Sequence, residues 1–178
     1  MQPDEISLRR IHTLTPALAN QIAAGEVIER PSSVVKELLE NSIDAGATEL
    51  IIRVAQGGST LIEIIDNGRG IHAEDLALSV TRHATSKIQT AEDLYAISSL
   101  GFRGEALASI AAVSRLTLTS SQDDSGIGYQ LEVNGTAFEH QQIQAVAAQK
   151  GTHIRIQDLF FNVPARRKFL KKPTTEFG

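Results

Sequence analysis

The order in which helical and strand patterns follow one another most constrains the fold of this chain. A cap and a first-turn proline at residues 15–16 predict a helix that continues to about Val27. Pro31 begins a second helix, and Gly46 is well placed to end it after Ala45. Two helices therefore come before the first strand pattern.

Apolar strand patterns follow this helix pair. Residues 50–54 and 61–66 join across Gly57-Gly58, which predicts a β-hairpin. Further helical patterns cover about 73–80, 91–98 and 104–113, and further strand patterns cover 115–120, 128–133, 137–146 and 152–159. Because helices and strands do not alternate as βαβ units, we predict an α+β fold: a two-layer sandwich with helices on one face of a mixed, mostly antiparallel sheet.

Composition limits the class of protein. A chain of 178 residues fits one domain, which buries about 70% of the surface that its unfolded chain exposes. The net charge of −4 argues against a strong nonspecific nucleic-acid binder, although a local basic patch remains compatible with it. The absence of cysteine excludes disulfides, thiolate metal sites and a cysteine nucleophile. No apolar run reaches the roughly 18 residues of a membrane helix, so we expect an intracellular protein.

The two ends of the chain suggest how it is organised. Residues 1–10 are polar and without periodicity, which predicts a mobile N-terminal arm before a domain spanning 11–178. A helical pattern begins near Ala165, and the chain then stops without a stop signal of its own. We interpret the chain as a fragment of a longer protein.

The second helix carries the first string with possible chemistry. Glu37 and Asn41 are four residues apart and therefore lie on the same helix face, at the edge of the apolar arc that runs from Val34 to Ile43. The side-chain oxygen of Asn41 suits a magnesium ion held partly by substrate phosphates. Glu37 could take a proton from attacking water. Taken alone, this string is better explained as a solvated helix face, since a Glu and an Asn at this spacing often occur by chance.

The second string, Asp66-Asn67-Gly68-Arg69-Gly70, ends the second strand. Strand alternation puts Asp66 on the same face as Ile62 and Ile64, where a carboxylate is costly to bury without partners. It could accept a hydrogen bond from the exocyclic amine of adenine and would reject guanine, which has an acceptor there. The alternative is a simple turn, since Asp-Asn-Gly is strong turn chemistry.

The third string is Thr85-Ser86-Lys87 with the segment 101–107. Gly101 and Gly104 bracket a loop before a predicted helix, where N–H groups could bind an anion, and Lys87 could add a positive charge. The spacing is not that of a Walker A loop. A glycine-containing loop between helices is the alternative.

In this order the three strings resemble the ATPase superfamily of gyrase, heat-shock chaperone, histidine kinase and MutL. Longer strings resemble the MutL mismatch-repair family from about residue 11 to the end. These are residues 21–27 (QIAAGEV), 40–47 (ENSIDAGA), 83–87 (HATSK), 101–107 (GFRGEAL) and 162–167 (NVPARR).

The resemblance implies a Bergerat-type ATP-binding fold and a role for each matching residue. Glu37 would be the general base, Asn41 the Mg²⁺ ligand and Asp66 the adenine acceptor. Gly70 would line the base pocket and Thr152 would complete it, although a β-branched residue in a strand is the simpler interpretation of Thr152 alone. The lid over the phosphates would run from 85 to 104, with contacts from Thr85, Ser86, Lys87, Gly101, Phe102, Arg103 and Gly104.

The family further implies an ATP-gated, dimerising clamp with weak Mg²⁺-dependent ATPase activity. Its partners would be DNA, MutS, a downstream nicking endonuclease and a helicase, with ATP-dependent dimerisation of N-terminal domains in a homodimer. A lysine from a second, transducer domain and a C-terminal dimerisation domain would be absent here, so the fragment should be nearly inactive. The family implies a cytoplasmic, nucleoid-associated protein in bacteria and a nuclear one in eukaryotes.

Two alternatives remain open: a phosphotransfer module of the histidine-kinase branch, and a nucleotide-independent DNA-binding or scaffold module. The basic cluster at 166–172 could contact DNA phosphates or be a solvated helix face, and we leave it outside the predicted site. The five histidines show no metal-binding spacing.

Overall fold

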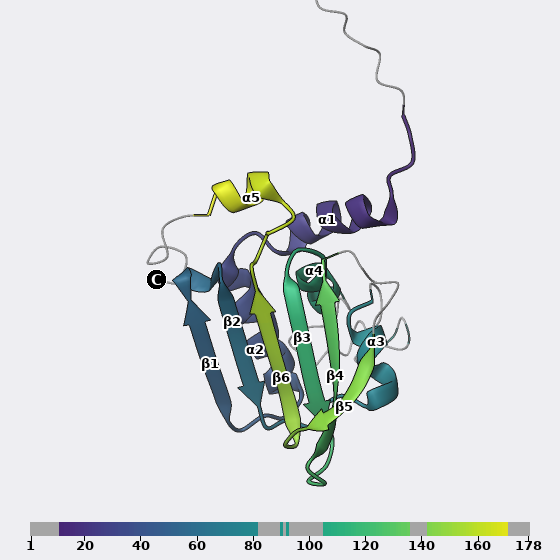
Figure 1. The fold of residues 1–178 in the computed structure, drawn as a ribbon, viewed down its shortest axis with the longest axis vertical. Coiled ribbons are helices and arrows are strands. Elements are labelled where there is room, and N and C mark those ends of the chain that lie inside the picture. Colours follow the sequence, from purple (N-terminus) through teal and green to yellow (C-terminus); the bar gives the residue numbers. More distant parts are fainter. Residues whose placement is uncertain (1–10, 82–89, 91, 93–104, 136–141, 171–178) are drawn as a thin grey trace, which may run out of the picture.

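The structure is a computed structural model that describes residues 11–81, 90, 92, 105–135 and 142–170. Figure 1 shows its helices and strands in their spatial arrangement. In chain order these are α1 (Pro16–Val27), α2 (Pro31–Asp44), β1 (Leu50–Ala55), η1 (Gln56–Gly58), β2 (Leu61–Asp66), η2 (Ala73–Asp75), α3 (Leu76–Ser79), α4 (Ala106–Ala112), β3 (Arg115–Ser121), β4 (Ile127–Asn134), β5 (Ile143–Ala147), β6 (Gly151–Gln157) and α5 (Pro164–Lys168).

Both N-terminal helices begin and end where the sequence predicts. The Thr15 hydroxyl accepts a hydrogen bond from the Leu18 N–H at 3.3 Å, which satisfies one of the free N–H groups at the start of α1. Helix α2 begins with a proline in its first turn and ends at Asp44. Gly46 follows with a φ of 74°, a conformation that glycine adopts without strain.

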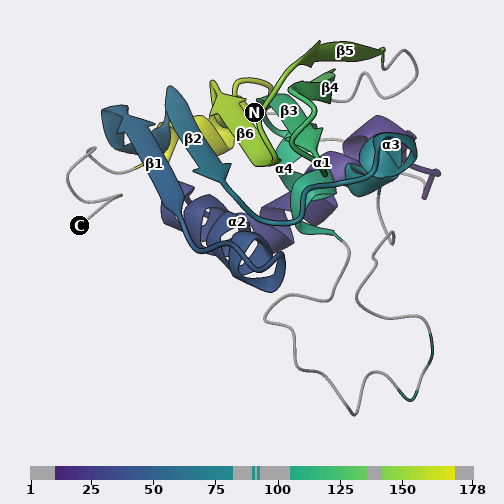
Figure 2. The same ribbon diagram turned by 90° about the horizontal axis from the view of Figure 1, so that it is seen from below.

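The predicted sandwich is confirmed. Six strands form one sheet in the order β1-β2-β6-β3-β4-β5, and each of the five pairs is antiparallel. Helices α1, α2 and α4 lie on one side of this sheet (Figure 2). The predicted strand at 137–146 is observed as β5 in its described part. The predicted N-terminal arm at 1–10 and all but residue 92 of the predicted helix at 91–98 lie outside the described residues.

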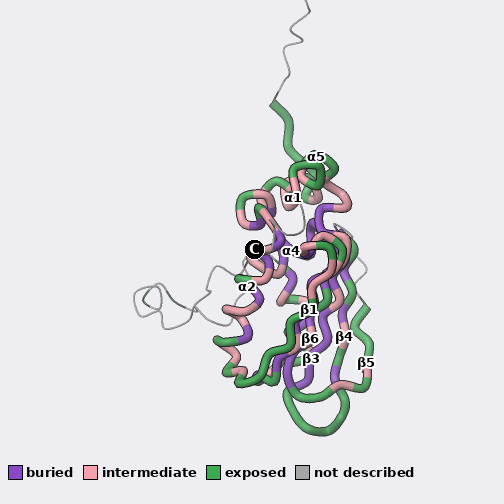
Figure 3. The backbone as a smooth tube through the Cα atoms, turned by 90° about the vertical axis from the view of Figure 1, so that its left-hand side faces the viewer, coloured by how far each residue is buried: buried purple, intermediate pink, exposed green. Residues whose placement is uncertain are grey.

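Apolar side chains on the helix-facing side of the sheet form two rows that cross the central strands. Cross-strand partners on one face of a sheet stand directly opposite each other, so each row is a continuous line of contacts. The first row is Ile62, Ile156, Leu116 and Val133, and the second is Ile64, Ile154, Leu118 and Leu131. Figure 3 shows buried residues along the central strands β3, β4 and β6, whereas the edge strands β1 and β5 are largely exposed.

The third row on the same side is polar where it crosses the middle of the sheet. Asp66 on β2 pairs with Thr152 on β6, and Thr152 pairs in turn with Ser120 on β3. All three are at most 9% exposed. Strand alternation therefore places Asp66 as predicted, on the same face as the two isoleucines that precede it.

One predicted core position is wrong. Ile43 was expected on the apolar arc of α2 but is 54% exposed, whereas its neighbour Ser42 is 4% exposed. The buried stripe of α2 runs through Val34, Leu38 and Ser42 at helical spacing. The hydroxyl of Ser42 is tolerated there because it has a hydrogen-bond partner on the sheet, described below.

Part of the C-terminal basic cluster binds the chain itself. Arg166 on α5 donates from Nη2 to the carbonyl oxygen of Gly25 at 2.8 Å and lies over the ring of Phe160 at 5.7 Å. A guanidinium at the end of α1 pairs with free carbonyls and with the negative end of the helix dipole. Arg167 and Lys168 are exposed. The cluster is therefore not one uniform solvated face.

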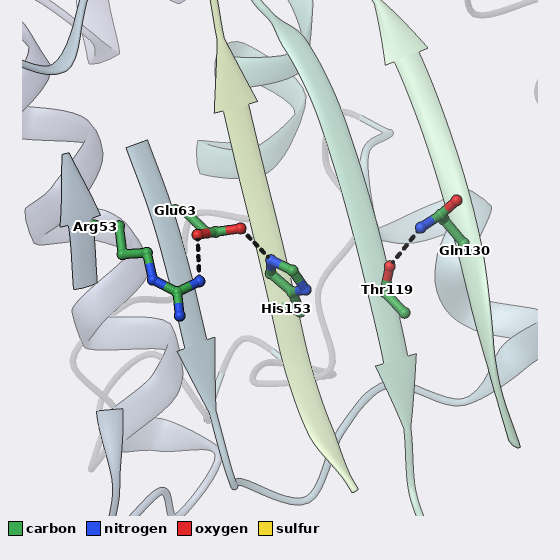
Figure 4. A network of polar contacts seen from close by, with 5 residues as sticks. All are labelled: Arg53, Glu63, Thr119, Gln130 and His153. Atoms are coloured by element: carbon green, nitrogen blue, oxygen red, sulfur yellow. Dashed lines mark hydrogen bonds and ion pairs between the residues drawn. The ribbon is translucent and has the colours of Figure 1, made fainter. Parts of the chain in front are cut away.

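A network of polar contacts lies on the sheet face opposite the helices (Figure 4). Glu63 accepts from Arg53 Nη1 at 2.8 Å, and its other oxygen lies 2.8 Å from His153 Nε2. The Arg53 hydrogen bond, with a smaller contribution from His153, lowers the pKa of Glu63 below 4.5 and outweighs the opposing effect of burial.

No helix within the described ranges has the length and hydropathy needed to cross a bilayer.

Because the pKa of Glu63 is lower in the folded than in the unfolded chain, its charged form stabilises the fold. That contribution is complete above pH 4.5 and is lost as the pH falls through the folded-state pKa. We expect Glu63→Gln to reduce the free energy of unfolding by about 1 kcal/mol near neutral pH. The value is small because the side chains of Arg53 and His153 are partly exposed to solvent, which screens the pairs. Urea denaturation at several pH values measures this, and the deficit should shrink below pH 4.5.

The matched control is Glu132→Gln, which removes an exposed carboxylate from the same face of the sheet. It should change the free energy of unfolding by less than about 0.5 kcal/mol. A Glu63→Gln deficit that stayed constant down to acidic pH would contradict the assignment.

Candidate functional site

The carboxylate of Asp66 is buried and held by donors from three segments. Its Oδ2 accepts from the Ser42 hydroxyl on α2 at 2.7 Å. Its Oδ1 accepts from the backbone N–H of Gly68 at 2.9 Å and of Thr152 at 3.3 Å. These bonds compensate for the burial of the group, which is 8% exposed.

The bond from Ser42 puts Asp66 beside the end of α2 that carries the predicted helix string. Asn41 immediately precedes Ser42, and Glu37 lies one turn earlier on the same helix. Both side chains are half-buried. The structure thus brings two of the three predicted strings together, although they are separated by more than 20 residues in the sequence.

The turn after Asp66 is tied to the loop that follows α2. Asn67 Oδ1 accepts from the N–H groups of Thr48 and Glu49 at 2.8 and 3.0 Å. The Arg69 N–H donates to the carbonyl oxygen of Ala45 at 3.0 Å. The Asp-Asn-Gly string is therefore a turn, as its alternative interpretation proposed, and this turn also holds the end of α2 against β2.

Thr152, predicted from the resemblance alone, lies next to Asp66 on the neighbouring strand. Its Oγ1 is 3.0 Å from the hydroxyl of Ser120, which also lies 2.9 Å from the Gly151 carbonyl oxygen. Ser120 Oγ accepts from the Ile71 N–H at 2.8 Å. One buried hydroxyl thus joins β6 to the loop that follows Gly70.

Two glycines permit close approach of backbone segments around this site. Gly70 has a φ of 72°, and a Cβ there would lie 2.2 Å from the carbonyl oxygen of Ser121. Gly151 has a φ of 122°, and a Cβ there would lie 1.9 Å from the carbonyl oxygen of Asp66. Only glycine fits at either position.

The third predicted string lies outside the described residues. This applies to Thr85, Ser86, Lys87, Gly101, Phe102, Arg103 and Gly104. Helix α4 begins at Ala106, as the pattern starting near Gly104 predicts.

Sequence reasoning missed Ser42 and Ser120. Ser42 is four residues after Leu38, a serine on the buried face of the helix, and such a position requires a partner. Ser120 alternates with Leu116 and Leu118, which places it on the helix-facing side of β3. In both cases the spacing of residues along the element predicts that the serine is buried, but it does not show which group its hydroxyl contacts.

The donor set on α2 is compatible with a magnesium ion. Asn41 and Glu37 provide neutral and charged oxygen atoms on one half-buried helix face beside a buried carboxylate, and Mg²⁺ prefers oxygen ligands. A surface hollow of about 380 Å³ lies at the same end of the sheet, lined by Asn67, Asp124, Gly126, Gln149 and Lys150. None of the predicted site residues that the structure describes lines it.

Comparison with known proteins identifies the class. The sequence model of the histidine kinase-, DNA gyrase B- and HSP90-like ATPase family matches residues 28–159, which include α2 and all six strands of the sheet. The chain belongs to this family of ATPases. The fold described above is therefore that of a member of this class.

Relatives narrow the class to the ATPase domain of the DNA mismatch repair protein MutL. The chain is 57% identical to MutL of Pseudomonas paraeruginosa over 168 residues, which is 94% of this chain and 26% of that protein. It is 58% identical to MutL of Azotobacter vinelandii over the same shares of the two chains. The chain thus spans about a quarter of the length of the curated relatives that it matches.

Solved structures agree with this assignment. The MutL ATPase domain of Aquifex aeolicus in complex with ADP has a TM-score of 0.61 and 37% identity, over 84% of this chain and 51% of that one. The N-terminal domain of a DNA repair protein has a TM-score of 0.72 and 32% identity, over 89% of this chain and 45% of that one.

Replacing Gly151 tests the close contact between β6 and Asp66. We expect Gly151→Ala to lower the free energy of unfolding by more than about 3 kcal/mol. The new Cβ would clash with the Asp66 carbonyl oxygen, and the positive φ would add backbone strain. Gly126→Ala is the matched control: Gly126 has a φ of 81° but open space around it. The Gly126→Ala variant should lose about 1 kcal/mol of unfolding free energy. Equal losses for both variants in urea denaturation would contradict the contact.

Proposed function

We propose that this chain binds ATP with Mg²⁺ through the row of Asp66 and Thr152 and the adjacent face of α2, and that the parent protein hydrolyses ATP during DNA mismatch repair. The observation that supports the proposal is the 2.7 Å bond from Ser42 to Asp66, which joins the proposed adenine acceptor to the helix bearing Glu37 and Asn41. A base, a metal ligand and a purine acceptor then belong to one site.

Asp66 would receive the exocyclic amine of adenine. A carboxylate has about four acceptor positions, and donors among the described residues occupy two on Oδ1 and one on Oδ2. The remaining position is on Oδ2, beside Ser42. Guanine presents an oxygen in place of the amine, which would face this carboxylate without a proton between them.

Asn41 would hold Mg²⁺ through its side-chain oxygen, with substrate phosphates as further ligands. When bound, Mg²⁺ would supply positive charge that neutralises the phosphates. Glu37, one turn further from Asp66, would take the proton of the attacking water as general base. Gly70 would line the base pocket. Thr85, Ser86, Lys87, Gly101, Phe102, Arg103 and Gly104 would form the lid and bind the phosphates.

The parent protein is proposed to act as an ATP-gated clamp. Closure of the lid would order the arm at 1–10 and bring two such domains together in a homodimer. This would couple mismatch recognition by MutS to a nicking endonuclease and a helicase on DNA. A lysine of a second domain would reach the terminal phosphate, so the chain on its own should hydrolyse ATP very slowly. Because the curated relatives are bacterial, we propose a cytoplasmic, nucleoid-associated protein.

Replacing Glu37 tests the proposed general base. In the full-length protein, Glu37→Ala should lower kcat for ATP hydrolysis by roughly 10²–10⁴-fold while ATP binding is retained. Steady-state phosphate release and equilibrium nucleotide binding measure the two quantities. Unchanged turnover would remove Glu37 from the mechanism, and transfer of radiolabel from ATP to a protein side chain would instead favour a phosphotransfer module.

Replacing Asp66 tests the proposed base recognition. Asp66→Asn should weaken ATP binding by about tenfold or more, because an amide cannot accept at both oxygen positions. Asp124→Asn, which changes an exposed acid with the same loss of charge, should leave ATP affinity unchanged. A wild-type protein that responds equally to Mg-ATP and Mg-GTP in thermal denaturation, or to neither, would favour a nucleotide-independent scaffold.

A further inference from the structure

The chain contains two Asn-Gly dipeptides, Asn67-Gly68 and Asn134-Gly135, and the proposed function uses neither asparagine. Asparagine before glycine is chemically labile, because the missing side chain lets the glycine nitrogen approach the asparagine Cγ. The N–Cγ bond closes a succinimide ring, and the Cγ–Nδ2 bond breaks with release of ammonia, which carries away the glycine N–H proton. Water then opens the ring to aspartate or isoaspartate, so water is the only co-reactant.

The fold requires glycine in both dipeptides. A Cβ at Gly68 would lie 2.9 Å from the Cβ of Ala45 and 3.0 Å from its carbonyl oxygen. Gly135 has a φ of 63°, and a Cβ there would lie 2.9 Å from Asn162 Nδ2. The labile sequence is therefore imposed at both places, and the surroundings of each asparagine decide whether it reacts.

The side chain of Asn67 is held in place by its neighbours. Its Oδ1 accepts from the N–H groups of Thr48 and Glu49 at 2.8 and 3.0 Å, and its Nδ2 donates to Thr48 Oγ1 at 2.9 Å. The Gly68 N–H donates to the carboxylate of Asp66 at 2.9 Å, a charge-assisted bond. The negative charge also opposes loss of the amide proton, so ring closure at Asn67 must break several bonds and work against an anion.

Asn134 lacks such restraints. Its side chain is exposed and makes no hydrogen bond to a described residue. It lies at the end of β4, beyond Leu131, where the pairing with β5 stops, so among the described strands only β3 flanks it. The Gly135 N–H donates to a neutral acceptor, the Ser114 carbonyl oxygen, at 2.9 Å. Because strand ends open at a low free energy, Asn134 can turn toward this nitrogen.

We propose that Asn134 is a site of spontaneous deamidation in this protein, and that Asn67 is protected by the contacts of its side chain. The inference is independent of nucleotide binding. Deamidation of Asn134 puts a negative charge opposite Arg115 on the sheet face away from the helices. At Asn67, isoaspartate would instead lengthen the backbone directly after Asp66. The contacts of Asn67 thus protect the turn that follows the buried carboxylate.

Peptide mapping by mass spectrometry tests the two rates in the full-length protein, incubated folded in mildly alkaline buffer. Asn67 should deamidate at least about tenfold more slowly than Asn134, because several hydrogen bonds must break first. In urea these contacts are lost, and the two rates should become similar. This comparison separates the effect of structure from that of the shared Asn-Gly sequence.

A pair of exposed threonines tests the cause of the protection. Thr48→Ala removes the acceptor of Asn67 Nδ2 and should raise the rate at Asn67 about threefold to tenfold, the effect of one hydrogen bond, without changing the rate at Asn134. Thr60→Ala is the matched control. The Thr60 hydroxyl donates to the Ala55 carbonyl oxygen at 3.2 Å, away from both dipeptides, and its loss should change neither rate.

Three results would overturn the inference. The first is deamidation of Asn67 at the rate of Asn134 in the folded protein. The second is an Asn134 that reacts in urea but stays unmodified in the folded protein. The third is an unchanged rate at Asn67 in Thr48→Ala, which would remove the side-chain contacts as the cause of protection.

Discussion

The site depends on how the fold satisfies one buried carboxylate. Asp66 lies on the core side of the sheet, where an ionised group is stable only if hydrogen bonds replace its lost hydration. Its three donors come from α2, from the turn that follows it and from β6. A register shift of one residue in β2 would turn Asp66 to the opposite face and leave these donors without their acceptor. The strand register and the site are therefore determined together.

The same strand register places the apolar core and the polar candidate site in different rows of side chains. Two apolar rows fill the space beneath the helices, and the next row is polar in the middle of the sheet. Polar groups at the end of a core can meet a ligand without interrupting the packed interior. The opposite face carries a different polar network, in which Glu63 is paired with Arg53 and His153. Alternation along single strands thus builds an ion-pair network on one face and a candidate nucleotide site on the other.

Much of the fold was predictable because its signals are local. Caps and prolines at the start of α1 and α2, and glycines in the first hairpin, act through the few residues beside them. Alternation along β2 correctly put Asp66 on the buried face. The prediction for Ile43 was wrong because helical periodicity places apolar residues on an arc but does not show where that arc meets the sheet. The basic cluster is also not one uniform solvated face, since Arg166 binds the end of α1.

By itself, the sequence determined the types and order of the main helices and strands among the described residues and the face on which Asp66 lies. It also indicated the family, through strings that match it over most of the chain. Only the tertiary structure decided which groups meet. It placed Ser42 against Asp66, set Thr152 and Ser120 in one row with it, and brought β6 close enough that Gly151 admits no side chain. The physical reason is that a sequence periodicity shows only on which side of its own helix or strand a side chain lies. The contacts arise from strand register and from packing between segments distant in the sequence, which no local pattern encodes.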